Sequence, residues 1–276
     1  MRADPGQGLL AGGSRRLRRE NIENPERDAW HLWQHASGSG DADANPGVSP
    51  NPEVSYWRAI TRRCQNVPLA HITGRRSFYD LEFLTSPDAL IPRPDSEAVV
   101  RLACRIPAKT ILDVGTGTGC LLLSILANSP GSHGTGTDIC PRALAVARAN
   151  GHRLNLADRC RFFISDWLKS DRLACYDLIL SNPPYISEDD YRNLSLEVRE
   201  HEPRHALTFG RNGTEAYERI ASQAVEHLRP GGWLLFEIGY GQFSPVRTIL
   251  QAHGLTIQMI ERDLDDRIRV IAARSS

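Results

Sequence analysis

The sequence predicts an α/β protein with a doubly wound, mostly parallel sheet of seven strands, preceded by a small N-terminal helical domain and a connecting β-hairpin. From residue 109 onward, short apolar runs alternate with segments of helical periodicity, which is the pattern of βαβ units. A glycine-rich turn, Gly115–Gly119, follows the first of these runs and opens the next helical segment. Both observations indicate parallel strands joined by crossover helices.

Composition limits the class of protein. The 276 residues, 41% of them hydrophobic, suit one large domain and one small one. The 33 basic and 33 acidic residues balance, which argues against bulk, non-specific binding of nucleic acid. The six cysteines form no C-x-x-C pair and none has metal-ligand spacing to a histidine, so we expect reduced, buried thiols, a cytoplasmic location and no metal site. No apolar run approaches the length of a membrane-spanning helix, and the N-terminus lacks a secretory signal.

The N-terminal part divides into a tail and a helical domain. Residues 1–17 are rich in Gly and Arg and are expected to be disordered. Residues 18–74 are expected to be helical, because Arg27–Trp33 has apolar positions at helical spacing and a second helix is predicted over 53–65, after Pro52. The polar residues 37–52 between them are predicted to form a loop.

The connecting hairpin is expected over 75–94, because Ser77–Leu84 is rich in strand-forming residues and Pro87 interrupts it. The rest, 95–276, is expected to be the catalytic domain, starting with a helix from about Asp95 to Cys104. Its strands are predicted over 110–114, 134–138, 161–165, 176–181, 232–238, 255–261 and 268–273, and its further helices over 118–128, 141–154, 214–228 and 242–252. Residues 262–267 are too few for a crossover helix, so the last two strands should pair as an antiparallel hairpin.

The glycine turn is the first candidate binding element. Glycine lets the backbone approach a ligand where a β-carbon would clash, and a helix N-terminus offers free N–H groups. The third glycine comes one position earlier than in the G-x-G-x-x-G dinucleotide fingerprint, so the turn is closer to the loop that wraps the methionine end of S-adenosylmethionine. A tight βα turn without a ligand is the alternative. The candidate cofactor-binding residues here are Gly115, Thr116, Gly117, Thr118 and Gly119.

Acidic residues follow the next two strands. Asp138 ends the second strand, where an acid binds ribose hydroxyls in nucleotide-binding doubly wound folds. The alternative is a cap on the helix that begins at Pro141; the two roles are compatible, and the glycine turn favours ribose. Asp166 and Trp167 follow the third strand, where they can bind the adenine amino group and cover its ring. A turn residue and a packing residue are the alternatives for this pair.

The tetrapeptide Asn182-Pro183-Pro184-Tyr185 ends the fourth strand and carries the chemistry. Proline has a fixed φ and no N–H, so the turn presents carbonyl oxygens without neighbouring donors. The Asn182 side-chain oxygen and the Pro183 carbonyl can accept both hydrogens of a planar –NH₂ group, on which Tyr185 can pack. These bonds strengthen as the nitrogen becomes cationic during methyl transfer. The candidate catalytic residues are therefore Asn182, Pro183 and Tyr185, and the candidate substrate-binding residues are these three with Pro184; an Asn-Pro turn without function is the alternative.

With these segments in order, the sequence resembles class I S-adenosylmethionine-dependent methyltransferases. More narrowly, it resembles the protein-(glutamine-N5) methyltransferases that act on peptide chain release factors. The narrower resemblance covers roughly residues 25–274, and an ordered combination of motifs is far more specific than any one of them. The segments that carry it are Pro68–Gly74, Leu81–Phe83, Ile91–Glu97, Asp113–Gly119, Asn182–Tyr185, Glu202-Pro203 with Ala206-Leu207, and Phe236–Gln242.

The resemblance implies S-adenosyl-L-methionine as cofactor, held by Gly115 to Gly119, Asp138 and Trp167, with Asn182 touching both cofactor and substrate. It implies a Rossmann-like fold and methylation of the glutamine in the Gly-Gly-Gln loop of a release factor, which the N-terminal helical domain contacts. The polar segment 37–52 and the extra residues 1–17 depart from the family pattern. These departures affect the docking of the partner more than the chemistry.

Alternatives remain for one residue and for the function. Arg93, in a proline-braced segment, either lines the site or forms a structural salt bridge. An N6-adenine or other nucleic-acid amino methyltransferase would use the same Asn-Pro-Pro-aromatic motif, but such enzymes carry a basic recognition region, so in this neutral chain no direct nucleic-acid substrate is expected. A binding module without activity would have lost a cofactor-contacting position, and none is lost.

Overall fold

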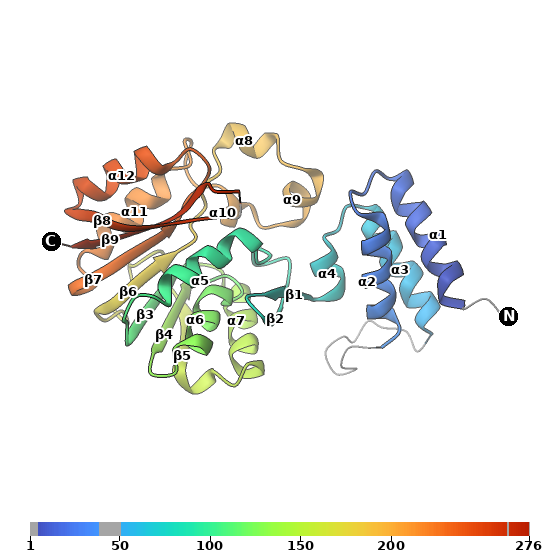
Figure 1. Cartoon of the computed structure of the whole chain (residues 1–276), viewed down its shortest axis with the longest axis horizontal. Helices are drawn as coiled ribbons and strands as arrows, with labels where there is room; N and C mark the ends of the chain where they lie inside the picture. The colour runs from blue at the N-terminus through green and yellow to red at the C-terminus, as the bar shows by residue number, and fades with distance from the viewer. Residues whose placement is uncertain (1–4, 39–50, 264, 276) are drawn as a thin grey trace. The chain divides into compact units, whose positions relative to one another are not determined.

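The structure, a computed structural model, describes residues 5–38, 51–263 and 265–275 (Figure 1). The chain divides into two compact units. The helical unit comprises residues 1–75 and 195–201, and the sheet unit comprises residues 76–194 and 202–276. Residues 39–50 of the predicted loop and residues 1–4 of the predicted tail lie outside the described residues.

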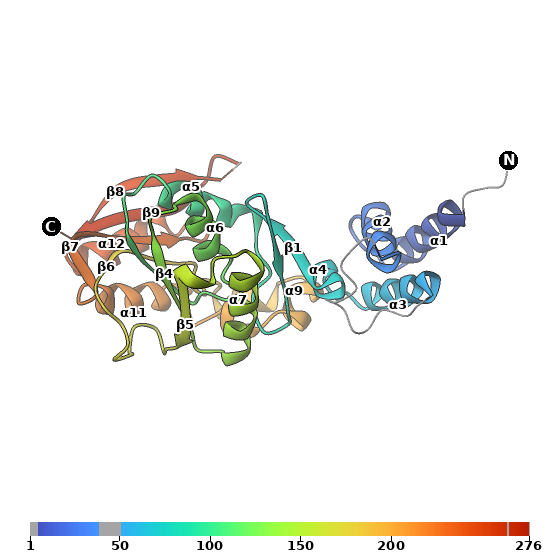
Figure 2. The ribbon, with the colours of Figure 1, turned by 90° about the horizontal axis from the view of Figure 1, so that it is seen from below.

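The helical unit packs around one apolar core. Its helices are α1 (Pro5–Arg19), α2 (Pro25–Ala36), α3 (Pro52–Cys64), α4 (Leu69–Thr73) and α9 (Leu196–His201). Proline at the start of α2 and α3 suits the first turn of a helix, where the missing N–H would have no partner. Helices α1, α2 and α3 lie side by side in both views (Figures 1 and 2). Leu17, Leu32, Tyr56 and Ile60 from these helices are fully buried at the centre.

The expected disordered tail is wrong for residues 5–17, which form most of α1. Leu17 is fully buried in the core of the helical unit. Two glycines of α1 lie in close contact with side chains of α3. A β-carbon on Gly13 would overlap the Tyr56 hydroxyl, and one on Gly12 would lie 3.1 Å from the Trp57 ring. The absence of side chains at these two positions lets α1 approach α3 closely, so the glycine content indicates tight helix packing here.

A buried arginine joins residues 195–201 to the helical unit. The Arg63 side chain donates from Nε to Asp28 Oδ2 at 2.8 Å, and its Nη2 lies 2.9 Å from Glu197 Oε2 on α9. Asp28 is 1% exposed, and its buried charge is partnered by Arg63 and by Arg27, whose Nη2 lies 3.3 Å from Asp28 Oδ1. The predicted range 18–74 therefore left out most of α1 and also residues 195–201, which lie far along the chain.

The sheet unit begins with the predicted hairpin, in which β1 (Arg75–Phe78) pairs with β2 (Leu81–Leu84). The 3₁₀ helix η2 (Pro94–Ser96) and α5 (Glu97–Ala103) lead into a seven-stranded sheet of order β5-β4-β3-β6-β7-β9-β8. Its strands are β3 (Thr110–Val114), β4 (His133–Asp138), β5 (Cys160–Ile164), β6 (Tyr176–Ser181), β7 (Leu228–Glu237), β8 (Leu255–Arg262) and β9 (Ile268–Ser275). Strands β3 to β7 are parallel, and β8 and β9 form the predicted antiparallel hairpin. The predicted fold class is confirmed.

Helices cover both faces of the sheet, as a doubly wound fold requires (Figure 1). One face packs on α5, α6 (Cys120–Asn128) and α7 (Pro141–Arg153), and the other on α11 (Glu215–Ala224) and α12 (Phe243–Ala252). Successive residues of a strand point to opposite faces, so Leu178 and Leu180 of β6 enter the first core and Ile179 the second. The remaining short helices are η3 (Ala157–Arg159), α8 (Glu188–Arg192) and α10 (Arg204–Leu207).

The structure can be compared with three expectations drawn from composition, which concern the cysteines, metal sites and membrane-spanning helices. All six cysteines are free; the expected burial of the thiols is wrong for Cys104 and Cys175, which are exposed, while the other four are partly buried. Within the described residues, no three His, Cys, Asp or Glu side chains gather where they could hold a metal ion. None of the helices in the described part of the chain has the length and apolar character needed to cross a membrane.

Candidate active site

The site lies where the order of the strands reverses. The chain proceeds from β3 outward through β4 and β5, then returns to β6 on the other side of β3 and proceeds outward through β7. In such sheets the loops after the two central strands diverge and leave a crevice at their carboxyl ends. The loops after β3 and β6 both line one pocket at this point, and Ser181 Oγ donates to the Val114 carbonyl at 2.7 Å between the two strand ends.

The glycine turn leaves open space in the pocket. Gly115, Gly117 and Gly119 all have positive φ, at 73°, 55° and 80°, which glycine adopts without strain. A β-carbon on Gly115 would have no atom within 4 Å, and one on Gly117 would meet only Ala89 at 4.0 Å. A β-carbon on Gly119 would instead lie 3.1 Å from Leu123 and 3.3 Å from Ala147. The first two glycines thus form an open cradle, and the third lets α6 pack against α7.

Two carboxylates hold the glycine turn in shape. Asp113, at 1% exposure, accepts a hydrogen bond from Thr116 Oγ1 at 2.7 Å, and burial raises the pKa of its carboxyl to about 7. Asp138 accepts from the Gly117 N–H at 2.9 Å with one oxygen and from the Cys140 N–H at 2.9 Å with the other. The second bond goes to the residue that caps α7, so the alternative of Asp138 as the helix N-cap is wrong. Asp138 also lines the pocket, and its ribose-binding role stays a prediction.

Aromatic side chains form another wall of the pocket. Trp167 has a left-handed backbone with φ of 57°, uncommon for a bulky residue, and its ring lies edge-on to Phe209 with centroids 5.1 Å apart. Both rings line the pocket, as do the adjacent Asp166 and the exposed Ile139. Apolar rings beside a carboxylate suit a flat heteroaromatic group.

The Asn182–Tyr185 turn is fixed from both sides. Asn182 Nδ2 donates to the Ser96 hydroxyl at 3.2 Å, while the Tyr185 carbonyl accepts from Gln242 Nε2 at 3.0 Å. Asn182 and Pro184 line the pocket, whereas Pro183 is buried. Burial raises the pKa of the Tyr185 hydroxyl to about 12, so this group is neutral at physiological pH.

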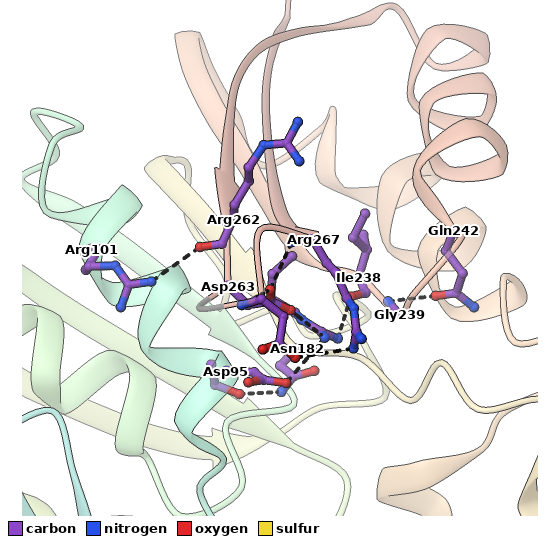
Figure 3. A network of polar contacts seen from close by, with 12 residues as sticks. Asp95, Arg101, Asn182, Ile238, Gly239, Gln242, Arg262, Asp263 and Arg267 are labelled. Atoms are coloured by element: carbon purple, nitrogen blue, oxygen red, sulfur yellow. Dashed lines mark hydrogen bonds and ion pairs between the residues drawn. The ribbon is translucent and has the colours of Figure 1, made fainter.

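A buried arginine braces the elements around Asn182. Arg269 Nη2 lies 2.9 Å from Asp263 Oδ2 and 3.3 Å from Asp95 Oδ2, and Nη1 donates to the Ile238 carbonyl at 3.2 Å. These contacts join β9, the turn after β8, the end of β7 and η2. Figure 3 shows Asp95 and Asp263 in this network together with Asn182, whose hydrogen bond goes to Ser96, the residue after Asp95.

Glu237, at the end of β7, is a buried acid beside this network. It is 1% exposed, and burial raises the pKa of its carboxyl to about 7, although the positive charge of Arg269 acts in the opposite direction. Ser181 of β6 pairs with Phe236 of β7 in the parallel register. The residues that follow them, Asn182 and Glu237, therefore lie at the same edge of the sheet.

The pocket gathers most of the predicted site residues. It is lined by Gly115, Thr116, Gly117, Thr118, Asp138, Asp166, Trp167, Asn182 and Pro184. Gly119, Pro183 and Tyr185 are not among its lining residues. Arg93 has both of its proposed features: it lines the pocket and forms an ion pair with the buried Glu202, whose other oxygen accepts from the Ile91 N–H at 3.2 Å.

Sequence reasoning gave no role to Ser96, Glu237 and Phe209. The first two lie in segments that carry the family resemblance, and Glu237 ends an apolar strand, where a charged residue is unusual enough to mark a buried functional group. Phe209 is brought to the pocket by the loop that follows α10, two residues after the Ala206-Leu207 segment. No pattern in the sequence indicates that contact.

Comparison with known proteins places the chain in a family. The family model described as the methyltransferase small domain matches residues 96–200, and that of the PrmC N-terminal domain matches residues 8–74. The second match starts at residue 8, so residues 8–17 are part of the family pattern and are not extra.

Two curated relatives match almost the full length. The release factor glutamine methyltransferase of Cereibacter sphaeroides is 40% identical over 265 residues, which cover 94% of each chain. The protein of that name from Bradyrhizobium diazoefficiens is 42% identical over 271 residues, covering 94% of this chain and 91% of its own.

Solved structures show the same fold at low identity. A methyltransferase from Pyrococcus furiosus matches 78% of this chain and 97% of its own, with a TM-score of 0.56 and 18% identity. The ribosomal protein L11 methylase from Lactobacillus delbrueckii subsp. bulgaricus matches 69% and 84%, with a TM-score of 0.51 and 20% identity. The fold and the family models together define a class I methyltransferase with a Rossmann-like sheet. Within that class, the chain belongs to the family of release factor glutamine methyltransferases.

Proposed function

We propose that this protein transfers a methyl group from S-adenosyl-L-methionine to the side-chain amide nitrogen of the glutamine in the Gly-Gly-Gln motif of peptide chain release factors. One observation carries the proposal: the open glycine cradle after β3 lines the same pocket as Asn182 and Pro184, which lie in the turn after β6. A pocket of this composition can hold a cofactor and present a planar amide to it at once. The names of the full-length relatives support this choice of substrate.

The residues present fit the proposed cofactor. The cradle at Gly115 and Gly117 leaves space that any side chain would fill, and the Asp138 carboxylate lies at its edge with lone pairs left for hydroxyl groups. Trp167 and Ile139 provide an apolar surface for an adenine ring, with Asp166 beside them for its amino group. When bound, S-adenosyl-L-methionine supplies an electrophilic methyl group on a sulfonium centre with a neutral leaving group.

The chain's own residues position the nitrogen. An amide nitrogen is a poor nucleophile because its lone pair is delocalised into the carbonyl group. The Asn182 side-chain oxygen and the Pro183 carbonyl each accept one of its hydrogens and stay fixed while positive charge grows on it. Tyr185 remains neutral, with a pKa raised to about 12, and packs on the amide without acting as a base. Proton loss follows methyl transfer, when the nitrogen has become strongly acidic.

The helical unit is proposed to bind the release factor. It has its own core, it matches the PrmC N-terminal domain, and it lacks the glycine cradle and the Asn-Pro-Pro turn. A substrate that acts in translation places the enzyme in the cytoplasm.

The experiment is mass spectrometry of purified release factor after incubation with the protein and labelled S-adenosylmethionine. We expect a gain of one CH₂ unit on the peptide that holds Gly-Gly-Gln. A release factor whose glutamine is replaced by alanine is the matched control and should gain nothing. Methylation of DNA or RNA in place of the release factor would contradict the proposal and favour an amino methyltransferase of nucleic acid.

A further inference from the structure

The Asn182–Tyr185 turn offers few places at which the protein can hold it. Pro183 and Pro184 have no N–H, so no backbone hydrogen bond can be donated from the middle of the turn. Proline also fixes φ at both positions, so the direction of the Pro183 carbonyl depends on how the two ends of the turn are held. At the downstream end, the Tyr185 carbonyl accepts a hydrogen bond from Gln242 Nε2 at 3.0 Å. This end of the turn is therefore held by a side chain from another segment.

The Gln242 amide uses its full hydrogen-bonding capacity. Nε2 donates to the Tyr185 carbonyl at 3.0 Å and to the Gly213 carbonyl at 3.1 Å. Oε1 accepts from the Gly239 N–H at 2.9 Å, as Figure 3 shows, and from the Tyr217 hydroxyl at 3.0 Å. A backbone N–H only donates and a carbonyl only accepts, so a reversed amide would place donor against donor and acceptor against acceptor. The neighbours of Gln242 thus determine that its donating end faces the turn.

Two glycines leave the space in which these contacts form. A β-carbon on Gly213 would lie 2.2 Å from the Tyr185 carbonyl oxygen. One on Gly239 would lie 2.7 Å from Gln242 Oε1 and 3.0 Å from the Tyr185 ring. A side chain at either position would push away the Tyr185 carbonyl or the Gln242 amide, so both glycines are needed for the contact.

The peptide group between Tyr185 and Ile186 is held at both ends. Its oxygen accepts from Gln242, and its N–H donates to the Leu207 carbonyl at 3.0 Å. These two bonds together fix the plane of the peptide group and, with it, the direction in which the chain leaves the turn. When the bond from Gln242 is removed, the bond to Leu207 remains, so we expect the turn to loosen while the fold is retained.

Gln242 lies outside the pocket and does not cap its own helix. It occupies the N-cap position of α12, and its side chain makes no capping bond there. It is not among the residues that line the pocket, so it acts on a substrate only through the turn. We infer that Gln242 is a positioning residue: by holding the Tyr185 carbonyl, it keeps the acceptors of the Asn182–Tyr185 turn directed at the substrate amide. This inference rests on the proposed function.

The first test uses the protein without a release factor. The dipeptide Tyr-Ile occurs once in the sequence, at 185–186, so protein labelled with ¹³C at tyrosine carbonyls and with ¹⁵N in isoleucine gives one correlation signal from this peptide group. Gln242→Glu keeps the shape and the accepting oxygen but, when ionised, donates no hydrogen. We expect the Tyr185 carbonyl carbon to move upfield in Gln242→Glu and in the uncharged Gln242→Met, because it loses a hydrogen bond. A signal that stays at its wild-type position would overturn the inference.

The second test measures turnover with release factor. Gln242→Glu is expected to lower kcat about tenfold or more while KM and the affinity for S-adenosylhomocysteine change less than about threefold, because positioning acts mainly on the transition state. Gln251→Glu is the matched control: it makes the same change at an exposed position of the same helix and should leave kcat unchanged. Gly239→Ala keeps the Gln242 amide but crowds its oxygen, so it should lower kcat in the same way and decides the question if Gln242→Glu folds poorly.

The two tests separate the inference from the proposed function. A Tyr185 signal that moves as expected, with a release factor that the wild type does not methylate, would support the role of Gln242 and contradict the substrate. A methylated release factor with unchanged kcat in Gln242→Glu would support the substrate and overturn the role of Gln242. A fall in KM and kcat together with fewer binding sites for S-adenosylhomocysteine would show loss of folded protein and would likewise overturn it.

Discussion

The Asp138 carboxylate accepts a hydrogen bond from the backbone N–H of Gly117, with 2.9 Å between oxygen and nitrogen. Its other oxygen accepts from Cys140 at the start of α7, so one side chain fixes both the floor of the cradle and the adjacent helix. The carboxylate is thus aligned by the protein before any ligand binds. A ligand hydroxyl that bonds to it meets an acceptor that needs no rearrangement.

Asp138→Asn is expected to weaken S-adenosylhomocysteine binding by about tenfold or more, because an amide accepts with only one oxygen and a charge-assisted bond is lost. Isothermal titration calorimetry gives the affinity. Asp158→Asn, an exposed acid in η3 before β5 and outside the pocket, is the matched control and should bind as the wild type does. Equal affinities for Asp138→Asn and the wild type would remove Asp138 from the cofactor site.

Asn182→Ala is expected to abolish detectable turnover while cofactor affinity stays within about tenfold of the wild type, or ~1.4 kcal/mol. The reason is that the proposed bond from the Asn182 oxygen acts on the substrate nitrogen, whereas the cradle and Asp138 lie after other strands. Turnover with release factor and calorimetry with S-adenosylhomocysteine measure the two effects. Complete loss of cofactor binding would show that the main role of Asn182 is structural or cofactor-directed.

Gly13→Ala is expected to destabilise the protein by about 1–3 kcal/mol, because a β-carbon there overlaps the Tyr56 hydroxyl in a packed core. Gly8→Ala lies on the same helix, in space with no atom within 4 Å of the added carbon. It should stabilise by up to ~1 kcal/mol through helix propensity. Chemical denaturation followed by circular dichroism compares the pair. If both changes stabilise, the close packing of α1 on α3 is wrong.

Glu237→Gln is expected to remove a pH dependence of stability. The pKa of Glu237 is about 7 in the folded protein and 4.5 when unperturbed, so between these values the folded state retains a proton that the unfolded state has released. Its contribution to stability therefore falls as pH rises from about 4.5 to 7, by ~3 kcal/mol. Subtracting the unfolding free energy of Glu237→Gln from that of the wild type at each pH cancels other groups such as Asp113. A difference that stays constant from pH 4 to 8 would contradict a raised pKa.

The sheet unit could be predicted from the sequence because its signals are local. Apolar runs such as Tyr176–Ser181 and the glycine turn fix strands and crossovers, and the short link before Ile268 fixes the final hairpin. The helical unit could not be delimited in the same way. Gly12 and Gly13 are helix-breaking by propensity, and only the Tyr56 and Trp57 side chains, more than 40 residues away, make them favourable.

The candidate site likewise contains residues that could be predicted from the sequence and residues that could not. The residues that follow strands β3, β4, β5 and β6 could be predicted, because parallel strands bring their carboxyl ends to one edge. Ser96 and Phe209 come from outside these loops and reach the pocket through tertiary packing. The raised pKa of Glu237 depends on its burial, which a single sequence does not encode in a local pattern.

Residues 195–201 leave the sheet unit, contribute Glu197 to Arg63, and return. The helical unit is therefore not one continuous stretch of chain, so a single crossover between genes could not exchange it whole. In a chimaera whose first 75 residues come from a distant homologue, the residue at position 63 would be matched to the acid of that homologue and not to Glu197 of this chain. Functional exchange of the N-terminal part should thus require the short internal stretch to be exchanged with it.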